Sequence, residues 1–181
     1  MIKRNIALVG MPGAGKTHIG RMLSARYKLP LIDTDKAVER AEGKPVTEVF
    51  AEHGEAYFRA LETAALAGAT AGSGAVISCG GGIVVTEKNV KILKDNCFVV
   101  FLRAKVETLL RRVKSGETRP LLAGDPEGKI YALLSARAAL YERAADYIID
   151  VDADDPAAVA SEIMAAAEKA GVTKRGTFTG F

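Results

Sequence analysis

The sequence is poor in cysteine, has no long apolar run and carries little net charge, and each shortage argues against a class of protein. Cys79 and Cys97 are the only cysteines and form no CxxC pair, so we expect neither a disulfide framework nor a zinc site. No apolar run approaches the ~18 residues of a membrane span. The net charge of +3 is too small to indicate nucleic-acid binding. We therefore expect a protein that binds neither a membrane nor a nucleic acid.

The start of the sequence also lacks a targeting pattern. Met1 leads into a short strand-like stretch, without the apolar core and the small-residue cleavage site of a signal peptide. Together with the unpaired cysteines, this favours a cytoplasmic location. The 181 residues, 49% of them apolar, suit one domain with a sizeable core. We assign that domain to residues 1–173 and interpret residues 174–181, which have no helical period, as a loose tail.

Strand-like and helical patterns alternate along the chain. Short apolar runs bounded by turn residues predict strands at residues 6–9, 31–32, 75–78, 97–102 and 147–149. Apolar stripes mark helices around residues 19–23, 106–113 and 127–144, and Thr86 is a suitable N-cap for a helix that ends near Lys94. This alternation predicts an α/β fold with a parallel sheet and helices on both of its faces.

The strongest motif is residues 10–17, Gly-Met-Pro-Gly-Ala-Gly-Lys-Thr, which matches the phosphate-binding pattern G-x-x-x-x-G-K-[ST]. The motif lies between a predicted strand and a predicted helix, and this context makes a chance match of a glycine-rich turn the weaker interpretation. Glycines let backbone N–H groups curl around phosphate oxygens, and the following helix adds its positive dipole end. Lys16 is expected to reach the β- and γ-phosphates of ATP, and Thr17 to bind Mg²⁺.

The nucleotide-binding residues predicted from this segment are Gly13, Ala14, Gly15, Lys16, Thr17 and His18. His18 follows the motif and is more typical of a helix face than of a ligand. A phosphate-binding loop shows only that a nucleoside triphosphate binds, since many such proteins are switches or motors.

Two carboxylates, Asp33 and Asp35, follow the second predicted strand. If the backbone stays extended, both side chains point to the same side, near the carboxyl ends of the strands where ligands bind in open α/β sheets. The third strand ends in Ser78, Cys79 and Gly80 without an acid, so Asp33 is the better candidate to hold Mg²⁺ through water. Asp35 would then accept a hydrogen bond from a substrate hydroxyl. Alternatively, the Asp-Thr-Asp segment is only an N-cap of the next helix.

Two arginines indicate an acidic substrate. Arg137 lies in the middle of the apolar stripe of its helix, and Arg59 could be oriented by an ion pair with Glu62 three residues later. An unpaired buried guanidinium is costly, whereas a carboxylate ligand accepts its two parallel N–H groups. The alternatives are an exposed helix charge for Arg59 and an internal salt bridge for Arg137.

Two glycine-rich segments complete the pattern. Gly80, Gly81 and Gly82 allow backbone amides to approach a ligand where a Cβ would collide, although a plain flexible turn would have the same composition. Thr118 to Leu122 is flanked by glycines and predicts a mobile lid at about residues 114–125. Closure would bring Arg119 to the transferring phosphoryl group and exclude water. An ordinary surface loop is the alternative.

Taken together and in this order, these motifs resemble those of the shikimate kinase family, over about residues 5–170. The resemblance implies a three-layer P-loop NTPase fold of the nucleoside monophosphate kinase type, with a five-stranded parallel sheet of order 2-3-1-4-5. It also implies a monomer with a substrate-binding segment at about residues 34–62. The implied reaction transfers the γ-phosphoryl group of ATP to shikimate, giving 3-phosphoshikimate and ADP.

The resemblance also assigns roles to individual residues. It places Lys16, Thr17 and Asp33 at the phosphates and Mg²⁺, Arg119 in the lid, and Arg112 at the adenine, with Arg111 as the alternative. It places Asp35 at the shikimate hydroxyls as a possible base, Arg59 and Arg137 at the shikimate carboxylate with Glu62 orienting Arg59, and Gly80, Gly81 and Gly82 along the ring.

Two other functions remain open at this point. One is another small-molecule kinase of the same architecture, such as a gluconate or nucleoside monophosphate kinase, in which the arginines meet a different anion. The other is a regulatory module that binds a nucleotide without transferring phosphate. The presence of Lys16, Thr17, Asp33 and Asp35 argues against the regulatory module.

Overall fold

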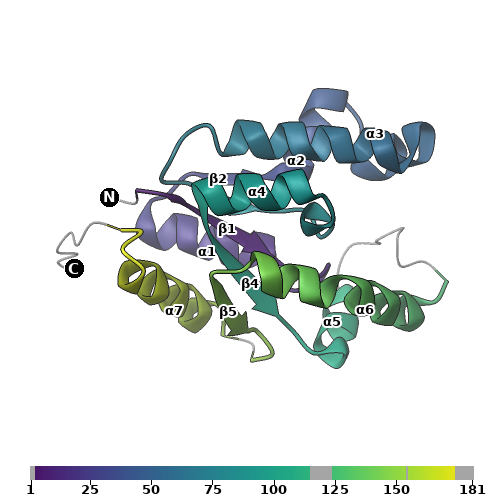
Figure 1. Ribbon diagram of the computed structural model, residues 1–181. Coiled ribbons are helices and arrows are strands. Elements are labelled where there is room, and N and C mark those ends of the chain that lie inside the picture. Colours follow the sequence, from purple (N-terminus) through teal and green to yellow (C-terminus); the bar gives the residue numbers. More distant parts are fainter. Residues whose placement is uncertain (1–2, 115–123, 154, 174–181) are drawn as a thin grey trace.

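The structure is a computed structural model that describes residues 3–114, 124–153 and 155–173 (Figure 1). Five parallel strands form one sheet in the order β2-β3-β1-β4-β5. They are β1 (Asn5–Val9), β2 (Leu31–Asp33), β3 (Val76–Ser78), β4 (Cys97–Arg103) and β5 (Tyr147–Asp150). The predicted sheet and its strand order are confirmed, and every predicted strand lies within one residue of the observed bounds at each end.

Helices cover both faces of the sheet. They are α1 (Lys16–Tyr27), α2 (Thr34–Glu42), α3 (Val46–Ala69), α4 (Glu87–Asn96), α5 (Val106–Lys114), α6 (Pro126–Ala144) and α7 (Pro156–Lys169), with a 3₁₀ turn, η1 (Ile83–Val85), before α4. Helices α1 and α7 pack together on one face, whereas α4 and α6 lie over β4 on the other (Figure 1). The predicted three-layer α/β architecture is confirmed.

The central strand β1 is buried on both faces of the sheet. Ile6, Ala7, Leu8 and Val9 have no exposed surface, and Ala7 lies between Ile77 of β3 and Val99 of β4. A strand covered on both faces reads as a continuous apolar run rather than an alternating one, which is the pattern of residues 6–9. The carboxyl ends of β1, β2 and β3 therefore meet at one edge of a rigid sheet.

Helices α2 and α3 form a hairpin with a small core of its own. Val38, Val49 and Phe58 are buried there, separate from the main core around the sheet. Gly54, at φ 79°, interrupts α3 with a backbone conformation that favours glycine. The second half of α3, which carries Arg59, therefore has a direction fixed by packing against α2 and α4.

The chain turns from strand to helix earlier than the sequence suggested. Strand β2 ends at Asp33 and α2 begins at Thr34, so the expectation that Asp33 and Asp35 share one face of an extended segment is wrong. Asp33 is instead the N-cap of α2, and its Oδ1 accepts from the amides of Asp35 (3.1 Å) and Lys36 (3.2 Å). A carboxylate cap satisfies helix N–H groups that have no partner within the helix, which explains the early turn.

Thr86 occupies the N-cap position of α4 as predicted, but its side chain makes no capping hydrogen bond. Over the ranges that the structure describes, none of the helices has both the length and the apolar character needed to cross a membrane.

Candidate active site

The phosphate-binding loop joins β1 to α1 at the carboxyl edge of the sheet. Gly10 needs to be glycine because a Cβ there would lie 2.7 Å from the backbone oxygen of Leu102 on β4. Gly15 is the N-cap of α1 with φ 93°, a left-handed conformation that side chains disfavour. The loop is thus pressed against the sheet and ends at the N-terminus of a helix, where an anion is favoured.

The polar side chains of α1 point back over this edge. Lys16 Nζ donates to the carbonyl oxygens of Gly10 (2.8 Å) and Met11 (3.0 Å). Thr17 Oγ1 donates to Asp33 Oδ2 at 2.9 Å and lies 3.1 Å from Ser78 Oγ. Oxygen atoms from α1, β2 and β3 therefore meet beside the loop, and hydroxyl and carboxylate oxygens are the donors that Mg²⁺ prefers.

A cavity of about 280 Å³ adjoins the loop on the α7 side. Arg112 of α5 borders it and donates to the carbonyl oxygens of Val151 (2.6 Å) and Ala14 (3.4 Å), whereas Arg111 is exposed and is not part of the lining. The residues that line it are Ala14, Gly15, His18, Ile19, Arg112, Val151, Ala153, Pro156 and Val159.

Sequence reasoning missed the four lining residues that follow β5, from Val151 to Val159, because no motif marks them. The signal that could have found these residues is their position after the carboxyl end of a strand, at the edge where α/β sheets bind ligands.

Asp35 lies on the first turn of α2, on the other side of the loop. Its pKa is raised from 3.8 to about 6, chiefly by burial and also by the neighbouring Asp33, while the Lys16 ammonium acts in the opposite direction. The two carboxylates therefore repel each other electrostatically, although they do not lie on one strand. The turn after β3 packs closely here, since a Cβ on Gly80 would lie 2.5 Å from Asp35 Oδ1 and 3.1 Å from Glu62 Oε1.

Arg59 forms the ion pair with Glu62 that helical spacing predicted. Arg59 Nη1 lies 2.7 Å from Glu62 Oε2, and Arg59 Nη2 lies 3.2 Å from Glu55 Oε1. The Glu62 side chain is 1% exposed and that of Arg59 17%, so the alternative of a solvent-exposed arginine is wrong. Burial raises the pKa of Glu62, and the Arg59 guanidinium partly offsets this. The pair thus holds a guanidinium in place at low exposure.

Arg137 approaches the same region from α6. The residue is half-buried, its Nη1 lies 3.3 Å from the carbonyl oxygen of Gly81, and its charge lowers the pKa of Glu62. The two guanidinium groups therefore face one carboxylate and one glycine turn, although they lie 78 positions apart in the sequence.

The glycine turn after β3 is the contact between the two halves of the site. Gly80 donates its N–H to Thr34 Oγ1 (2.9 Å), a Cβ on Gly81 would lie 3.1 Å from Pro12 Cδ of the phosphate-binding loop, and a Cβ on Gly82 would collide with the Arg59 guanidinium. Three consecutive glycines are thus enclosed by the loop, α2 and α3. The structure thus brings the residues predicted to bind phosphate close to those predicted to bind a carboxylate.

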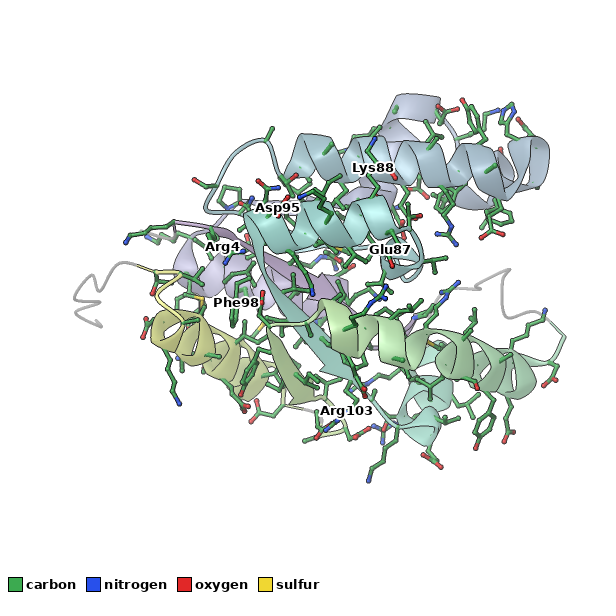
Figure 2. All side chains as sticks on the ribbon, viewed as in Figure 1. Arg4, Glu87, Lys88, Asp95, Phe98 and Arg103 are labelled. Atoms are coloured by element: carbon green, nitrogen blue, oxygen red, sulfur yellow. The ribbon has the colours of Figure 1, made fainter. Side chains whose placement is uncertain are left out.

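Side chains farther along these elements tie the layers together. Figure 2 shows Glu87 at the start of α4, next to α6, where its Oε1 accepts from Arg143 Nη2 at 2.5 Å. Asn89 of α4 is fully buried, accepts from Thr63 of α3 (2.7 Å) and donates to the carbonyl oxygen of Ile83 (3.1 Å). These contacts link α3, α4 and α6 around the glycine turn.

Two predictions concern parts of the chain outside the described residues. Arg119 and most of the predicted lid fall in residues 115–123, and the predicted tail begins at residue 174. Both remain predictions.

The fold and the site together define a P-loop kinase that acts on a small molecule. The family model described as shikimate kinase matches residues 12–168. The chain belongs to the shikimate kinase family, and it is an ATP-dependent kinase, a transferase.

Individual relatives agree with this assignment. The shikimate kinase of Caldanaerobacter subterraneus subsp. tengcongensis is 42% identical over 164 residues, which cover 90% of this chain and 95% of that protein. The shikimate kinase of Moorella thermoacetica is 43% identical over 162 residues, covering 90% and 93%. The solved structure of shikimate kinase from Acinetobacter baumannii in complex with shikimate has a TM-score of 0.88 and 34% identity, covering 94% of this chain and 96% of that one.

Proposed function

We propose that this chain transfers the γ-phosphoryl group of ATP to the 3-hydroxyl of shikimate, giving 3-phosphoshikimate and ADP. The observation that carries the proposal is the glycine turn, because Gly81 packs on Pro12 of the phosphate-binding loop and Gly82 packs on the Arg59 guanidinium. A molecule with a carboxylate at one end and a hydroxyl at the other can then reach a triphosphate held by the loop.

On the nucleotide side, the amides of Gly13, Ala14 and Gly15 and the Lys16 ammonium hold the β- and γ-phosphates. Lys16 donates to carbonyls of the loop in the structure, and phosphate oxygens would take the place of these acceptors. The adenine occupies the cavity bordered by Arg112, Pro156 and Val159, where a guanidinium plane and apolar walls suit a flat base. His18 borders this cavity rather than the phosphates.

Thr17 and Asp33 are the residues that would hold Mg²⁺ with the triphosphate, Thr17 directly and Asp33 through water. Their oxygens are hard donors 2.9 Å apart. The residues that the structure describes contain no group of three His, Cys, Asp or Glu side chains suited to a metal ion. This agrees with an ion that is bound by few protein ligands and shared with phosphates. When bound, the ion offsets negative charge on the β- and γ-phosphates.

On the acceptor side, Arg59 and Arg137 bind the shikimate carboxylate, and Glu62 holds Arg59 in the orientation that this requires. The amides of Gly80, Gly81 and Gly82 lie along the ring because no side chain keeps it away. Asp35 accepts a hydrogen bond from the hydroxyl that reacts. The pairing of two cations with one carboxylate excludes neutral sugars as good acceptors.

In the reaction, the oxygen of the 3-hydroxyl forms a bond to the γ-phosphorus, and the bond from that phosphorus to the β–γ bridging oxygen breaks. The electron pair of the broken bond stays with ADP, and the hydroxyl proton passes to Asp35. Lys16 and Arg119 offset charge on the oxygens of the transferring group, Arg119 from a lid that closes over the nucleotide. We further propose that the protein is a cytoplasmic monomer.

The test is acceptor-dependent release of ADP from Mg-ATP, with shikimate, gluconate, nucleoside monophosphates or no acceptor in parallel. We expect release with shikimate only, and NMR of the product should place the phosphate on the 3-oxygen. Release with gluconate or a nucleoside monophosphate instead would make the chain a different small-molecule kinase. If none of these reactions releases ADP although ATP still binds, the chain is a regulatory nucleotide-binding module.

A further inference from the structure

Tyr141 is a buried polar residue to which the reaction described above assigns no role. It lies on α6 one turn after Arg137, has no exposed surface, and stacks its ring on Phe101 of β4 with centroids 5.0 Å apart and an interplanar angle of 21°. Its hydroxyl donates to the carbonyl oxygen of Gly81 at 2.5 Å, and Met11 Sδ of the phosphate-binding loop lies 4.0 Å from the same hydroxyl. One hydroxyl thus contacts both the glycine turn and the loop.

The carbonyl oxygen of Gly81 accepts hydrogen bonds from two donors that lie at different distances. Tyr141 approaches to 2.5 Å, whereas Arg137 Nη1 stays at 3.3 Å, beyond the usual range for N–H···O bonds. Both donors come from the same face of α6, because residues four apart lie one above the other on a helix. The tyrosine therefore satisfies this carbonyl, and the arginine is only weakly engaged by it.

The Tyr141 hydroxyl stays protonated, and can therefore donate a hydrogen bond, at the pH values at which enzymes are assayed. Burial raises the pKa of Tyr141 to about 12, with the nearby Arg137 guanidinium acting in the opposite direction. The ring cannot move away easily, since it is fixed between Phe101 and the main core. Both the position and the protonation state of the donor are therefore constant.

We infer that Tyr141 is a positioning residue for the acceptor: its hydroxyl satisfies the Gly81 carbonyl, so that the Arg137 guanidinium is left for the substrate carboxylate. This inference rests on the proposed function, in which Arg137 binds that carboxylate. Without the hydroxyl, the carbonyl of the half-buried Gly81 would lose its shorter donor, and the cation that already contacts it is Arg137. The turn would then compete with the substrate for the same guanidinium.

The first test is Tyr141→Phe, which keeps the ring and its stacking and removes only the hydroxyl. We expect KM for shikimate to rise about 10-fold, the scale of one buried hydrogen bond, with KM for ATP changed less than about twofold. The rise should be the same from pH 6.5 to 9, since the hydroxyl does not ionise there. Tyr147→Phe is the matched control, because its hydroxyl bonds to Glu162 at 2.7 Å on an exposed surface. It should leave both KM values unchanged.

A double-mutant cycle with Arg137→Ala separates this inference from the proposed function. If Tyr141 acts through Arg137, the hydroxyl loses its effect once the guanidinium is gone, so Tyr141→Phe should raise KM for shikimate less than about twofold in the Arg137→Ala background. A full 10-fold rise in that background would overturn the inference. If Arg137→Ala alone leaves KM for shikimate unchanged, the proposed carboxylate site itself is wrong.

A measurement on the unaltered protein covers the case in which Tyr141→Phe does not fold. In a crystal structure with shikimate bound, Tyr141 should still donate to Gly81, while Arg137 Nη1 should have left that carbonyl for the carboxylate. A structure in which the tyrosine hydroxyl has turned to the ligand, or in which Arg137 still contacts Gly81, would contradict the inference.

Discussion

The two halves of the site are built in different ways. The nucleotide half consists largely of backbone groups from one continuous loop, held by contacts between residues a few positions apart, such as Lys16 with Gly10 and Met11. The acceptor half consists of side chains from α2, α3 and α6 gathered around the turn after β3. In the proposed function, the backbone of the loop binds the phosphates of ATP, whereas the gathered side chains determine which acceptor reacts.

The two halves also differ in the burial of their charged side chains. In the acceptor half, Glu62 and Arg59 are paired at low exposure, and Asp35 has a pKa raised to about 6 by burial and by Asp33. Such groups are expensive to keep in a folded protein, and they are held in place before the substrate arrives. Substitutions in the two halves should therefore separate turnover, acceptor affinity and stability from one another.

The largest effect is expected in the nucleotide half. Lys16→Ala removes the cation that we propose offsets charge on the transferring phosphoryl group, so kcat should fall by about 10³-fold or more. Affinity for shikimate, measured by calorimetry in the absence of nucleotide, should change little. An equal loss of shikimate affinity would mean that the halves are not separable.

The matching substitution in the acceptor half is Arg137→Ala. Losing a charge-assisted hydrogen bond to a carboxylate should raise KM for shikimate by about 10- to 100-fold, with KM for ATP changed less than about twofold. Steady-state kinetics with each substrate varied in turn measure both constants. Equal weakening for ATP and shikimate would remove the proposed role.

The pH profile tests Asp35. The carboxylate must be ionised to accept the hydroxyl proton, so kcat/KM for shikimate should fall about tenfold per pH unit below a pKa of about 6. The Asp35→Asn variant should have little activity, and its kcat/KM should no longer fall as the pH is lowered through 6. A profile that stays flat from pH 7 to 5 would exclude Asp35 as the group that takes the proton.

The same raised pKa has a consequence for stability. Because the folded-state pKa lies above the ordinary value of 3.8, the stabilising state of Asp35 is the protonated one, and its contribution is lost as pH rises through about 6. Asp35→Asn should therefore raise Tm at pH 8 while it removes activity. A lower Tm at pH 8 would contradict this sign.

The smallest effect, mainly on stability, is expected for Glu62→Gln. Burial raises the pKa of Glu62 more than the Arg59 guanidinium lowers it, so the ionised carboxylate is not a net stabilising group at pH 8. A neutral amide of the same shape should therefore raise the free energy of unfolding slightly. Urea denaturation measures this change. Glu55→Gln is the control, because an exposed partner of the same guanidinium should contribute less than about 1 kcal/mol. A lower free energy of unfolding in Glu62→Gln than in Glu55→Gln would contradict this sign.

How much could be predicted from the sequence follows the same division. The phosphate-binding loop was predictable because its spacing is local, and the strand order followed from the family resemblance that the motifs carried. The pairing of Arg59 with Glu62 was predictable because helical spacing alone brings them together. By contrast, the sequence left open whether the chain stays extended through Asp35 or whether Asp-Thr-Asp caps the next helix, and the structure shows the cap at Asp33.

Contacts between distant elements could not be derived from spacing. Pro156 and Arg112 border one cavity, and Tyr141 bonds to Gly81, only because the strand order β1-β4-β5 brings α5, α6 and α7 beside the loop. Packing decides such contacts, and no local pattern in the sequence records them.

The most direct test of the shared site is a crystal structure with ADP and shikimate bound together. Our account predicts ADP on the loop from Gly10 to Thr17, the shikimate carboxylate on Arg59 and Arg137, and the 3-hydroxyl beside Asp35 facing the β-phosphate. Shikimate bound away from the glycine turn, or with its carboxylate toward the phosphates, would contradict it.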